Sequence, residues 1–250
     1  MSARRIFDAH LHIVDPRFPL TPNYGYLPPM FTAADYAVRV GRLGVAGGAV
    51  VSGSFQAFDQ SYLLDALQTL RGAFVGVTQI PADTSDERIV ELDAAGVRAV
   101  RFNVRRGGSA SLDDLDRLAR RVHDLAGWHT ELYIDSTDLP DLAPMLTRLP
   151  AVSIDHLGLS AAGLPELLRL VESGARVKAT GFGRGDVDVR AAMRRIVEID
   201  PHALVFGTDL PSTRAPRAFD DGDVEVVHEA VGDELIDDVL WGNAVRLYRV

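Results

Sequence analysis

Cysteine and long apolar segments are both missing from the sequence. Without cysteine the chain has no disulfide, no thiolate metal site and no cysteine nucleophile, so any metal would depend on histidine and carboxylate ligands. No apolar run of about 18 residues occurs, which argues against a transmembrane helix. The N-terminal stretch MSARRIFDAHLHIVD is interrupted by polar residues and lacks the apolar core of a signal peptide. We therefore expect a cytoplasmic protein without a membrane partner.

Positive charge is also in short supply. The 250 residues include 26 Lys and Arg against 35 Asp and Glu, a formal net charge of −9. Such a surface repels a phosphate backbone, so we expect no nucleic-acid partner. With 47% hydrophobic residues the chain can bury a large core. Its length suits either one large α/β barrel or two smaller domains, and nothing in it decides whether the protein forms a homo-oligomer.

Strand-like and helix-like patterns alternate along the whole chain. The strand candidates are short, apolar and rich in β-branched residues, as parallel strands buried on both faces are. They are predicted at Ile6–His12, Gly48–Ser52, Ala73–Ile80, Val97–Val104, Glu131–Asp135, Val152–His156, Ala175–Thr180 and Leu204–Asp209. Eight βα pairs without a break in composition predict the α/β class, as a single (β/α)8 TIM barrel over residues 1–250. A Gly-x-Gly-x-x-Gly turn after the first strand is absent, which weakens a Rossmann alternative.

Capping residues mark where several of the intervening helices begin. Thr32 stands three residues before Asp35, and Ser85 and Ser111 precede further amphipathic stretches. Asp59 is expected to cap a helix over Tyr62–Leu70. Further helices are predicted at Leu139–Leu149, Leu164–Glu172 and Val189–Ile199, and the tail Asp223–Tyr248 is predicted to form two helices separated near Gly232.

A pair of histidines closes the first predicted strand, in Asp8-Ala9-His10-Leu11-His12. Residues two apart on a strand point the same way, so His10 and His12 should project together at its carboxyl end. In a barrel, that end is the mouth where active sites form. Two adjacent imidazoles can share a metal or donate hydrogen bonds to a developing oxyanion, and they can also be purely structural.

Titratable residues also end the sixth and eighth predicted strands. His156 lies in Ile154-Asp155-His156-Leu157-Gly158, and Asp209 lies in Gly207-Thr208-Asp209-Leu210-Pro211. Strands one, six and eight thus deliver such groups to one rim, which is typical of a barrel enzyme. The connections after strands one and eight are long, and both lie on this same side of the predicted barrel.

Taken together, these motifs resemble the amidohydrolase superfamily. The likeness is closest to the amidohydrolase-related group that includes 2-pyrone-4,6-dicarboxylate lactonase, sugar-acid lactonases and some metal-dependent decarboxylases. It extends over nearly the whole chain. The matching segments are Asp8–His12 with Asp15-Pro16 and Phe18-Pro19, Gly96–Asn103, Ile154–Gly158, Gly207–Pro211 and Gly242–Tyr248.

The resemblance implies a role for each of the four residues. Asp209 matches the strand-eight aspartate that acts as general base on the hydrolytic water. His10, His12 and His156 match histidines that either ligate a metal or polarise the scissile carbonyl. These four are therefore the candidate catalytic residues, and they would also be the ligands of a metal if one is bound.

The lactonases of this group bind substrate carboxylates with arginines and a tyrosine. Arg101 on strand four is the best match to one of these arginines, and Arg105 or Arg106 matches a second, since the register after Val104 is open. Arg184 follows strand seven, where the family places another. Each arginine could instead pair with one of the many acids. Further substrate contacts are expected from Tyr133, Ser54 and Tyr26.

Lysine is almost absent, and this bears on the metal. Many metal-dependent amidohydrolases bridge two metals with a carboxylated lysine on strand four, where this chain has Arg101. The only lysine is Lys178, on predicted strand seven. A binuclear site is therefore not expected, and the four ligands that remain would suit one Zn²⁺ with an open position for water. The lactonases that the sequence resembles keep these residues and work without metal, so we favour no required cofactor and keep one Zn²⁺ as the alternative.

Three functions follow from these expectations. The first is a hydrolase that opens a lactone or related cyclic ester of a carboxylated small molecule, because clustered arginines bind such anions. The second is a mononuclear zinc decarboxylase or amidohydrolase that uses His10, His12, His156 and Asp209 as ligands. The third is a catalytically silent barrel that binds a metabolite, which the intact set of four residues disfavours.

Overall fold

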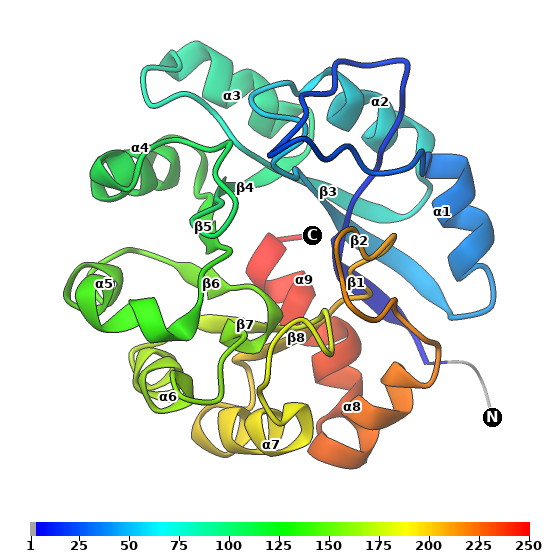
Figure 1. The fold of residues 1–250 in the computed structure, drawn as a ribbon, viewed down its shortest axis with the longest axis vertical. Helices are drawn as coiled ribbons and strands as arrows, with labels where there is room; N and C mark the ends of the chain where they lie inside the picture. Colours follow the sequence, from blue (N-terminus) through cyan, green and yellow to red (C-terminus); the bar gives the residue numbers. More distant parts are fainter. Residues whose placement is uncertain (1–3) are drawn as a thin grey trace.

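Eight parallel strands form one sheet in the computed structural model, which describes residues 4–250 (Figure 1). Each strand pairs with the next one in the chain, in the order β1 to β8. Their bounds are β1 (Ile6–Leu11), β2 (Val45–Val51), β3 (Ala73–Thr78), β4 (Val97–Phe102), β5 (His129–Leu132), β6 (Val152–Ile154), β7 (Arg176–Ala179) and β8 (Leu204–Phe206). The predicted (β/α)8 barrel is confirmed.

Helices surround the sheet and cover its outer face (Figure 1). They are α1 (Ala33–Val40), α2 (Ser61–Thr69), α3 (Asp86–Ala94), α4 (Leu115–Ala126), α5 (Leu139–Leu146), α6 (Leu164–Glu172), α7 (Val189–Ile199), α8 (Asp223–Val231) and α9 (Asn243–Tyr248), with short helical turns η1 (Leu112–Asp114), η2 (Ser136–Asp138), η3 (His156–Gly158) and η4 (Asp238–Gly242). Thr32 makes the predicted capping box with Asp35, and Ser85 caps α3. Asp59 accepts from the Tyr62 amide at 3.5 Å at the start of α2, as predicted, although the N-cap position itself is Gln60, which makes no side-chain cap. Among the described residues no helix is long and apolar enough to span a bilayer.

Several strands end earlier than predicted, and the reason lies in the site. β6 and β8 were expected to reach His156 and Asp209, but they end at Ile154 and Phe206. His156 and Asp209 have φ angles of 54° and 60°. A residue in this left-handed region cannot continue a strand, so each side chain is turned out of the sheet at the mouth.

The barrel closes where β1 meets the segment after β8. The Asp209 amide donates to the His10 carbonyl, and the His12 amide donates to the Leu210 carbonyl, both at 2.7 Å. Gly207 lies so close to β1 that a Cβ there would come within 2.6 Å of the His10 nitrogen. The approach of the two chains therefore brings the histidines of β1 beside Asp209.

A buried carboxylate, Asp8, holds this seam from outside the barrel. It accepts hydrogen bonds from the Thr208 amide at 2.7 Å and the Thr208 hydroxyl at 2.6 Å. It also accepts from the Tyr36 hydroxyl of α1 at 2.9 Å. Burial raises the pKa of Asp8, and these hydrogen bonds act in the opposite direction. Asp8 thus joins β1, α1 and the start of the loop that carries Asp209.

Inside the barrel, an apolar layer and a polar layer are stacked. Phe7, Val75 and Val205 belong to the interior apolar cluster, which Tyr248 of α9 joins. The Tyr248 hydroxyl donates to Glu131 Oε1 at 2.6 Å. The floor is therefore sealed by α9, and polar side chains begin directly above it.

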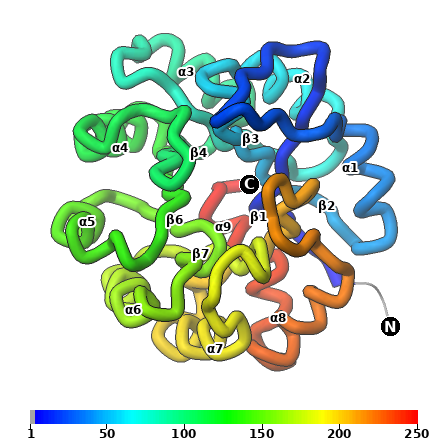
Figure 2. Tube along the Cα trace, viewed as in Figure 1, coloured from blue at the N-terminus to red at the C-terminus, as the bar shows by residue number. Residues whose placement is uncertain are grey.

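Two long loops lie together over one side of the mouth, and they are the blue loop after β1 and the orange loop after β8 in Figure 2. The first is held by an antiparallel bridge between Val14 and Phe31. Arg214 of the second donates to Asn23 Oδ1 of the first at 2.9 Å. Both loops follow strands at the carboxyl end, as the sequence predicted.

We predict that the contact between β1 and the segment after β8 is weakened when Asp8 is replaced by a neutral residue. Asp8→Asn should lower the free energy of unfolding by roughly 1.5–3 kcal/mol, because charge-assisted hydrogen bonds are lost. Tyr36→Phe, which removes one donor, should cost only about 1 kcal/mol. Urea denaturation of both variants measures the difference, and an equal loss for the two would contradict the role given to Asp8.

Candidate active site

The four residues singled out in the sequence meet at the carboxyl end of the barrel. Ligand atoms of His10, His12 and Asp209 all lie within 4.8 Å of one another. The His10 ring centroid lies 5.0 Å from that of His12 and 4.8 Å from that of His156. All four side chains are buried. The predicted convergence is therefore found, although His10 lies deepest and His12 and His156 line the pocket above it.

A bulge in β1 makes this arrangement possible. The register of β1 with β2 shifts between Asp8 and Leu11. Ala9 belongs to the apolar cluster inside the barrel, whereas Leu11 belongs to the cluster between sheet and helices. A regular strand would point His10 to the side opposite Ala9. The bulge lets His10 face the interior as well, as bulges beside active sites often re-aim a side chain.

His12 is held as a hydrogen-bond acceptor toward the pocket. Its Nδ1 lies 2.7 Å from the Val51 carbonyl, which can only accept, so Nδ1 carries the proton. Burial, with His10 and Arg101 nearby, holds the pKa of His12 well below its usual range. The ring is therefore neutral, and Nε2 presents a lone pair. This revises the expectation that His12 donates to a substrate carbonyl.

His156 is neutral for a similar reason. Burial and then the charge of Arg184 hold the pKa of His156 well below its usual range. Its Nδ1 lies 2.8 Å from the Thr180 hydroxyl, which can donate or accept. When Thr180 donates, Nε2 carries the proton and is a donor. The ring edge also meets Tyr133, with centroids 5.1 Å apart.

Asp209 has one occupied and one free oxygen. Arg184 donates from Nε to Oδ2 at 2.6 Å, and the same guanidinium donates to the Thr213 carbonyl at 3.0 Å. Burial would lower the pKa of Arg184, but the Asp209 carboxylate outweighs it and raises that pKa. Oδ1 of Asp209 has no hydrogen-bond partner among the described residues. It is therefore an available, buried acceptor.

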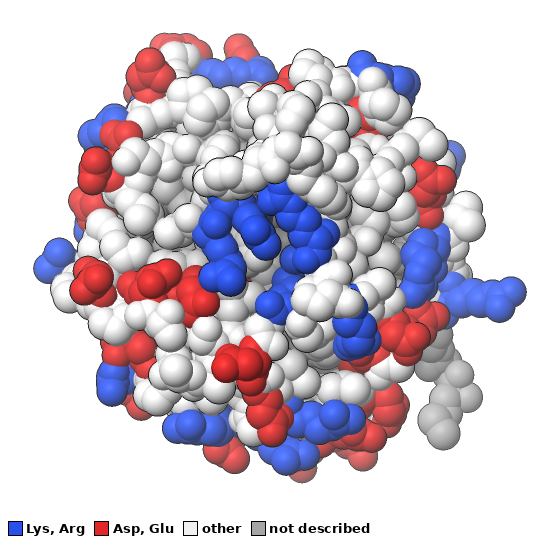
Figure 3. Space-filling model, viewed as in Figure 1, with Lys and Arg blue, Asp and Glu red and all other residues white. Residues whose placement is uncertain are grey.

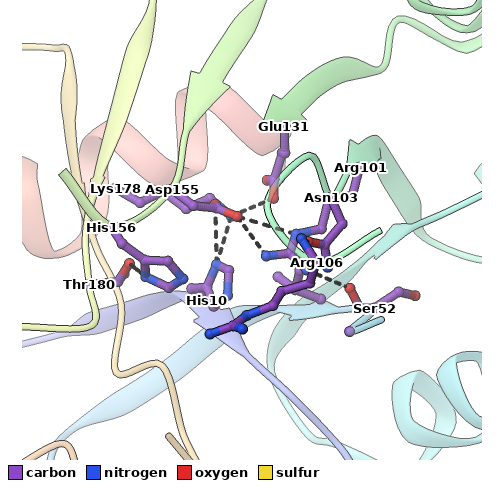
Figure 4. A network of polar contacts seen from close by, with 12 residues as sticks. His10, Ser52, Arg101, Asn103, Arg106, Glu131, Asp155, His156, Lys178 and Thr180 are labelled. Carbon is purple, nitrogen blue, oxygen red and sulfur yellow. Dashed lines mark hydrogen bonds and ion pairs between the residues drawn. The ribbon is translucent and has the colours of Figure 1, made fainter. Parts of the chain in front are cut away.

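A network of buried charges lies beside His10 (Figure 4). Asp155 accepts from Arg101 through Nη2 at 2.8 Å and Nε at 3.2 Å. Lys178 lies 2.5 Å from Glu131 Oε2 and 3.5 Å from Asp155 Oδ1. Burial would raise the pKa of Asp155, but His10, Lys178 and Arg101 hold it well below its usual range. Asp155 is thus a carboxylate on which two cations converge.

Asp155, Glu131 and Lys178 were not among the predicted site residues. A signal for them was present, because a lysine and a glutamate inside short apolar strands are costly unless they face a partner. Glu131 lies in β5 and Lys178 in β7. What the pattern could not tell is that the two strands turn these side chains toward each other.

Basic side chains gather around a hollow at the centre of the carboxyl face (Figure 3). The pocket is lined by His12, Tyr26, Gly53, Ser54, Phe55, Arg101, Asn103, Arg106, Tyr133, His156, Arg184, Thr213 and Arg214. All six predicted substrate-binding residues are in this set. Arg105 instead pairs with Asp135 at 3.2 Å, so the register left open in the sequence is resolved in favour of Arg106.

The arginines of the pocket differ in how far they are already occupied. Arg101 is 3% exposed, and besides Asp155 it donates to the Ser52 carbonyl at 2.9 Å. Within residues 4–250, Arg106 has no side-chain ion pair, although its backbone is bonded to Asn103. Arg214, which sequence reasoning missed, stacks over the Tyr26 ring at 4.3 Å. Arg106 is therefore freer to meet an anion than Arg101, whereas Arg214 already donates from Nη1 and Nη2 to Asn23.

Two groups of side chains in the described part of the chain could hold a metal ion. One is His10, His12 and Asp209, and the other is His10, Asp155 and His156. The lone pair of His12 Nε2 and the free Oδ1 of Asp209 are suitable donors for Zn²⁺. By donor type, then, the first group fits a single ion.

Comparisons with known proteins agree with this fold and identify the family. A family model described as Amidohydrolase matches residues 7–250. A 2-pyrone-4,6-dicarboxylate hydrolase of Comamonas testosteroni is 31% identical over 96% of this chain and 89% of its own length. A 4-sulfomuconolactone hydrolase of Hydrogenophaga intermedia is 27% identical over 97% of this chain and 88% of its own length. A solved apo structure from Agrobacterium tumefaciens has the same fold, with a TM-score of 0.86 at 24% identity over 99% of this chain and 96% of that one.

The geometry predicts that Arg101 is needed for stability. Arg101→Met should lower the free energy of unfolding by about 3–5 kcal/mol, because Asp155 loses its bidentate partner in a buried place. Arg106→Met should change it by less than about 1 kcal/mol, since that side chain is partly exposed. Chemical denaturation of the two variants tests the contrast, and equal stabilities would show that the pair with Asp155 contributes little.

Proposed function

The chain belongs to the amidohydrolase family, and on that premise we propose that it opens, by hydrolysis, the ring of a lactone that carries further carboxylate groups. Two relatives that cover most of its length are named as hydrolases of such rings. The pocket adds a chemical reason, because four arginines line it in a protein of net charge −9. A local basic rim of this kind attracts anions despite the overall acidity.

One observation carries the proposal: two free acceptor atoms face each other above the buried network. Within the part of the chain that the structure describes, Asp209 Oδ1 has no hydrogen-bond partner, and His12 Nε2 has a lone pair. Ligand atoms of these two residues lie within 4.8 Å of each other. A water that donates one hydrogen bond to each would need them about 4.6 Å apart. Such a water keeps its own lone pair free for a carbonyl carbon.

In the proposed reaction, Asp209 is the general base. It takes one proton from the water as the water oxygen bonds to the lactone carbonyl carbon, and His12 Nε2 holds the second proton in place. The carbonyl oxygen gains negative charge in this step, and the Nε2 proton of His156 is positioned to stabilise it. The ring C–O bond then breaks, and Asp209 returns its proton to the leaving oxygen. A carboxyl group and a hydroxyl group are the products.

The remaining carboxylates of the substrate would lie against the outer wall of the pocket. Arg106 can supply bidentate hydrogen bonds there, and Arg214, held by Asn23, adds positive charge. Ser54, Tyr26 and Tyr133 provide hydroxyls on the same surface. Arg101 contributes only its unoccupied N–H groups, since Asp155 and Ser52 take the others. Arg184 keeps its main contact with Asp209.

A metal-free reaction is part of this proposal. Were Zn²⁺ to bind, His10, His12 and Asp209 would hold it, and the ion would lower the pKa of a bound water. The buried charges already balance, however, with Arg101, Lys178 and Arg184 against Glu131, Asp155 and Asp209. A divalent ion would leave two uncompensated positive charges in a place where charge is costly.

The general-base role predicts a specific kinetic change. Asp209→Asn should lower kcat by roughly 10²–10⁴-fold with little change in KM, because the amide accepts a hydrogen bond but not a proton. Arg106→Met is the matched comparison, and it should raise KM by about 10-fold or more while kcat stays close to wild type. A screen of lactones with one, two or three carboxylates identifies the substrate. When the reaction is run in H₂¹⁸O, incorporation of ¹⁸O into the product distinguishes hydrolysis from isomerisation.

Chelation tests the metal-free part separately. We expect the purified protein to keep its activity after exhaustive treatment with a chelator, as checked by elemental analysis of the same sample. Activity that disappears on chelation and returns with Zn²⁺ would instead support a zinc-dependent decarboxylase or amidohydrolase acting through the same residues.

A further inference from the structure

His10 has two partners at one nitrogen that require opposite proton positions. Its Nδ1 lies 3.4 Å from Lys178 Nζ and 3.4 Å from Asp155 Oδ1. The ammonium group can only donate, so it needs a bare Nδ1, whereas the carboxylate can only accept, so it needs Nδ1–H. The partner that prevails decides whether the other nitrogen, Nε2, carries a proton.

Three contacts favour Lys178. The ammonium is fixed by Glu131 Oε2, so it cannot turn away from the ring. The contact from Lys178 to Nδ1 has hydrogen-bond geometry, and Lys178 Nζ also lies 3.5 Å from Asp155 Oδ1, so the ammonium faces this oxygen without a proton on Nδ1. Asp155 is also already neutralised by Arg101 through two hydrogen bonds to its other oxygen. Protonation of His10 Nδ1 would also place two hydrogen-bond donors, this N–H and the Lys178 ammonium, only 3.4 Å apart.

The opposite side of the ring agrees independently. His10 Nε2 and Asp209 Oδ1 are both buried, both lack a partner among the described residues, and lie 3.9 Å apart. With a proton on Nε2 this is an attractive contact that a small movement would close. With a bare Nε2, two lone pairs would face each other across this buried contact, which is unfavourable.

We propose that Lys178 fixes the tautomer of His10, so that Nε2–H points at Asp209 and orients this carboxylate. His10 and Lys178 are then positioning residues, and they act through Asp209 without contact with the substrate. Their effect on turnover rests on the function proposed above, whereas the tautomer itself does not. In the alternative tautomer, Asp155 would accept from Nδ1–H, and Nε2 would be free for a metal.

The fixed tautomer has a consequence for metal binding. A metal-bound histidine must offer a lone pair, and Nε2–H offers none. Lys178 therefore removes one ligand from the group formed with His12 and Asp209. The same side chain that orients the proposed base thus also works against a metal at this position.

Nitrogen NMR can read the tautomer directly. In protein labelled with [¹⁵N]histidine, two-bond ¹H–¹⁵N spectra distinguish the two neutral tautomers and the imidazolium, and loss of signals in His10→Gln assigns the ring. We expect a protonated Nε2 and a bare Nδ1. Because Lys178 is the only lysine, [¹⁵N]lysine gives a single side-chain signal that reports on the ammonium. A proton on Nδ1, alone or together with Nε2–H, would overturn the inference.

Variants then test whether Lys178 is the cause. Lys178→Met alone leaves Glu131 as a buried, unpaired charge, so the double variant Lys178→Met/Glu131→Gln is used, with Glu131→Gln as its control. The control should keep Nε2–H, and the double variant should switch to Nδ1–H. Relative to the control, the double variant should lose about 10-fold or more in kcat at similar KM and gain at least about 10-fold in affinity for Zn²⁺ by calorimetry.

The outcomes separate the two proposals. A double variant with an unchanged tautomer and unchanged Zn²⁺ affinity would show that Lys178 is only structural, whatever the activity. If the His10 tautomer switches in the double variant but the wild-type protein opens no lactone, this inference holds and the proposed function is wrong.

Discussion

The buried carboxylate of Asp155 is the group on which the interior of this barrel depends. It lies beyond the end of β6, where it meets Arg101 from β4, Lys178 from β7 and His10 from β1. Four strands are thus joined through one side chain. A buried ion pair does not stabilise a fold by itself, because desolvation offsets the attraction. Its effect here is geometric, since each partner is held at one orientation.

Charges in the upper barrel alternate in sign, and this order explains the polarity of the site. Glu131 faces Lys178, Asp155 faces Arg101, and Asp209 faces Arg184. Against the effect of burial, nearby cations hold the pKa values of Glu131 and Asp155 below their usual range, and Arg184 donates to one oxygen of Asp209. His12 and His156 stay neutral between these pairs, because burial and nearby cations lower their pKa values. In the pocket, hydrogen-bond acceptors and hydrogen-bond donors therefore belong to different residues.

Local backbone geometry and long-range packing combine at the mouth. His156 and Asp209 leave their strands in a left-handed conformation, and β1 carries a bulge beside His10. Such conformations cost free energy, and they persist when the surrounding structure determines them. For Asp209 and the β1 bulge, the seam between β1 and the β8 loop does so, through hydrogen bonds to the backbone of His10 and His12 and through Asp8.

The sequence by itself was sufficient for the barrel and for its four central residues. Alternating βα patterns are local, and parallel strand ends must meet at one rim, so His10, His12, His156 and Asp209 could be placed together before any coordinates. The six substrate-contacting candidates also proved to line one pocket. The placement of the four central residues depends only on where each stands relative to the end of its own strand, whereas the six candidates came from the family resemblance.

Only the tertiary structure decided which side chains pair, and thereby which atoms are free. Lys178 and His10 stand 168 positions apart, and Arg101 and Asp155 stand 54 apart. The donor state of His12 depends on a carbonyl of the neighbouring strand β2. Strand length and spacing cannot predict such contacts, because they follow from barrel curvature, from the bulge in β1 and from competition among many acids for each arginine.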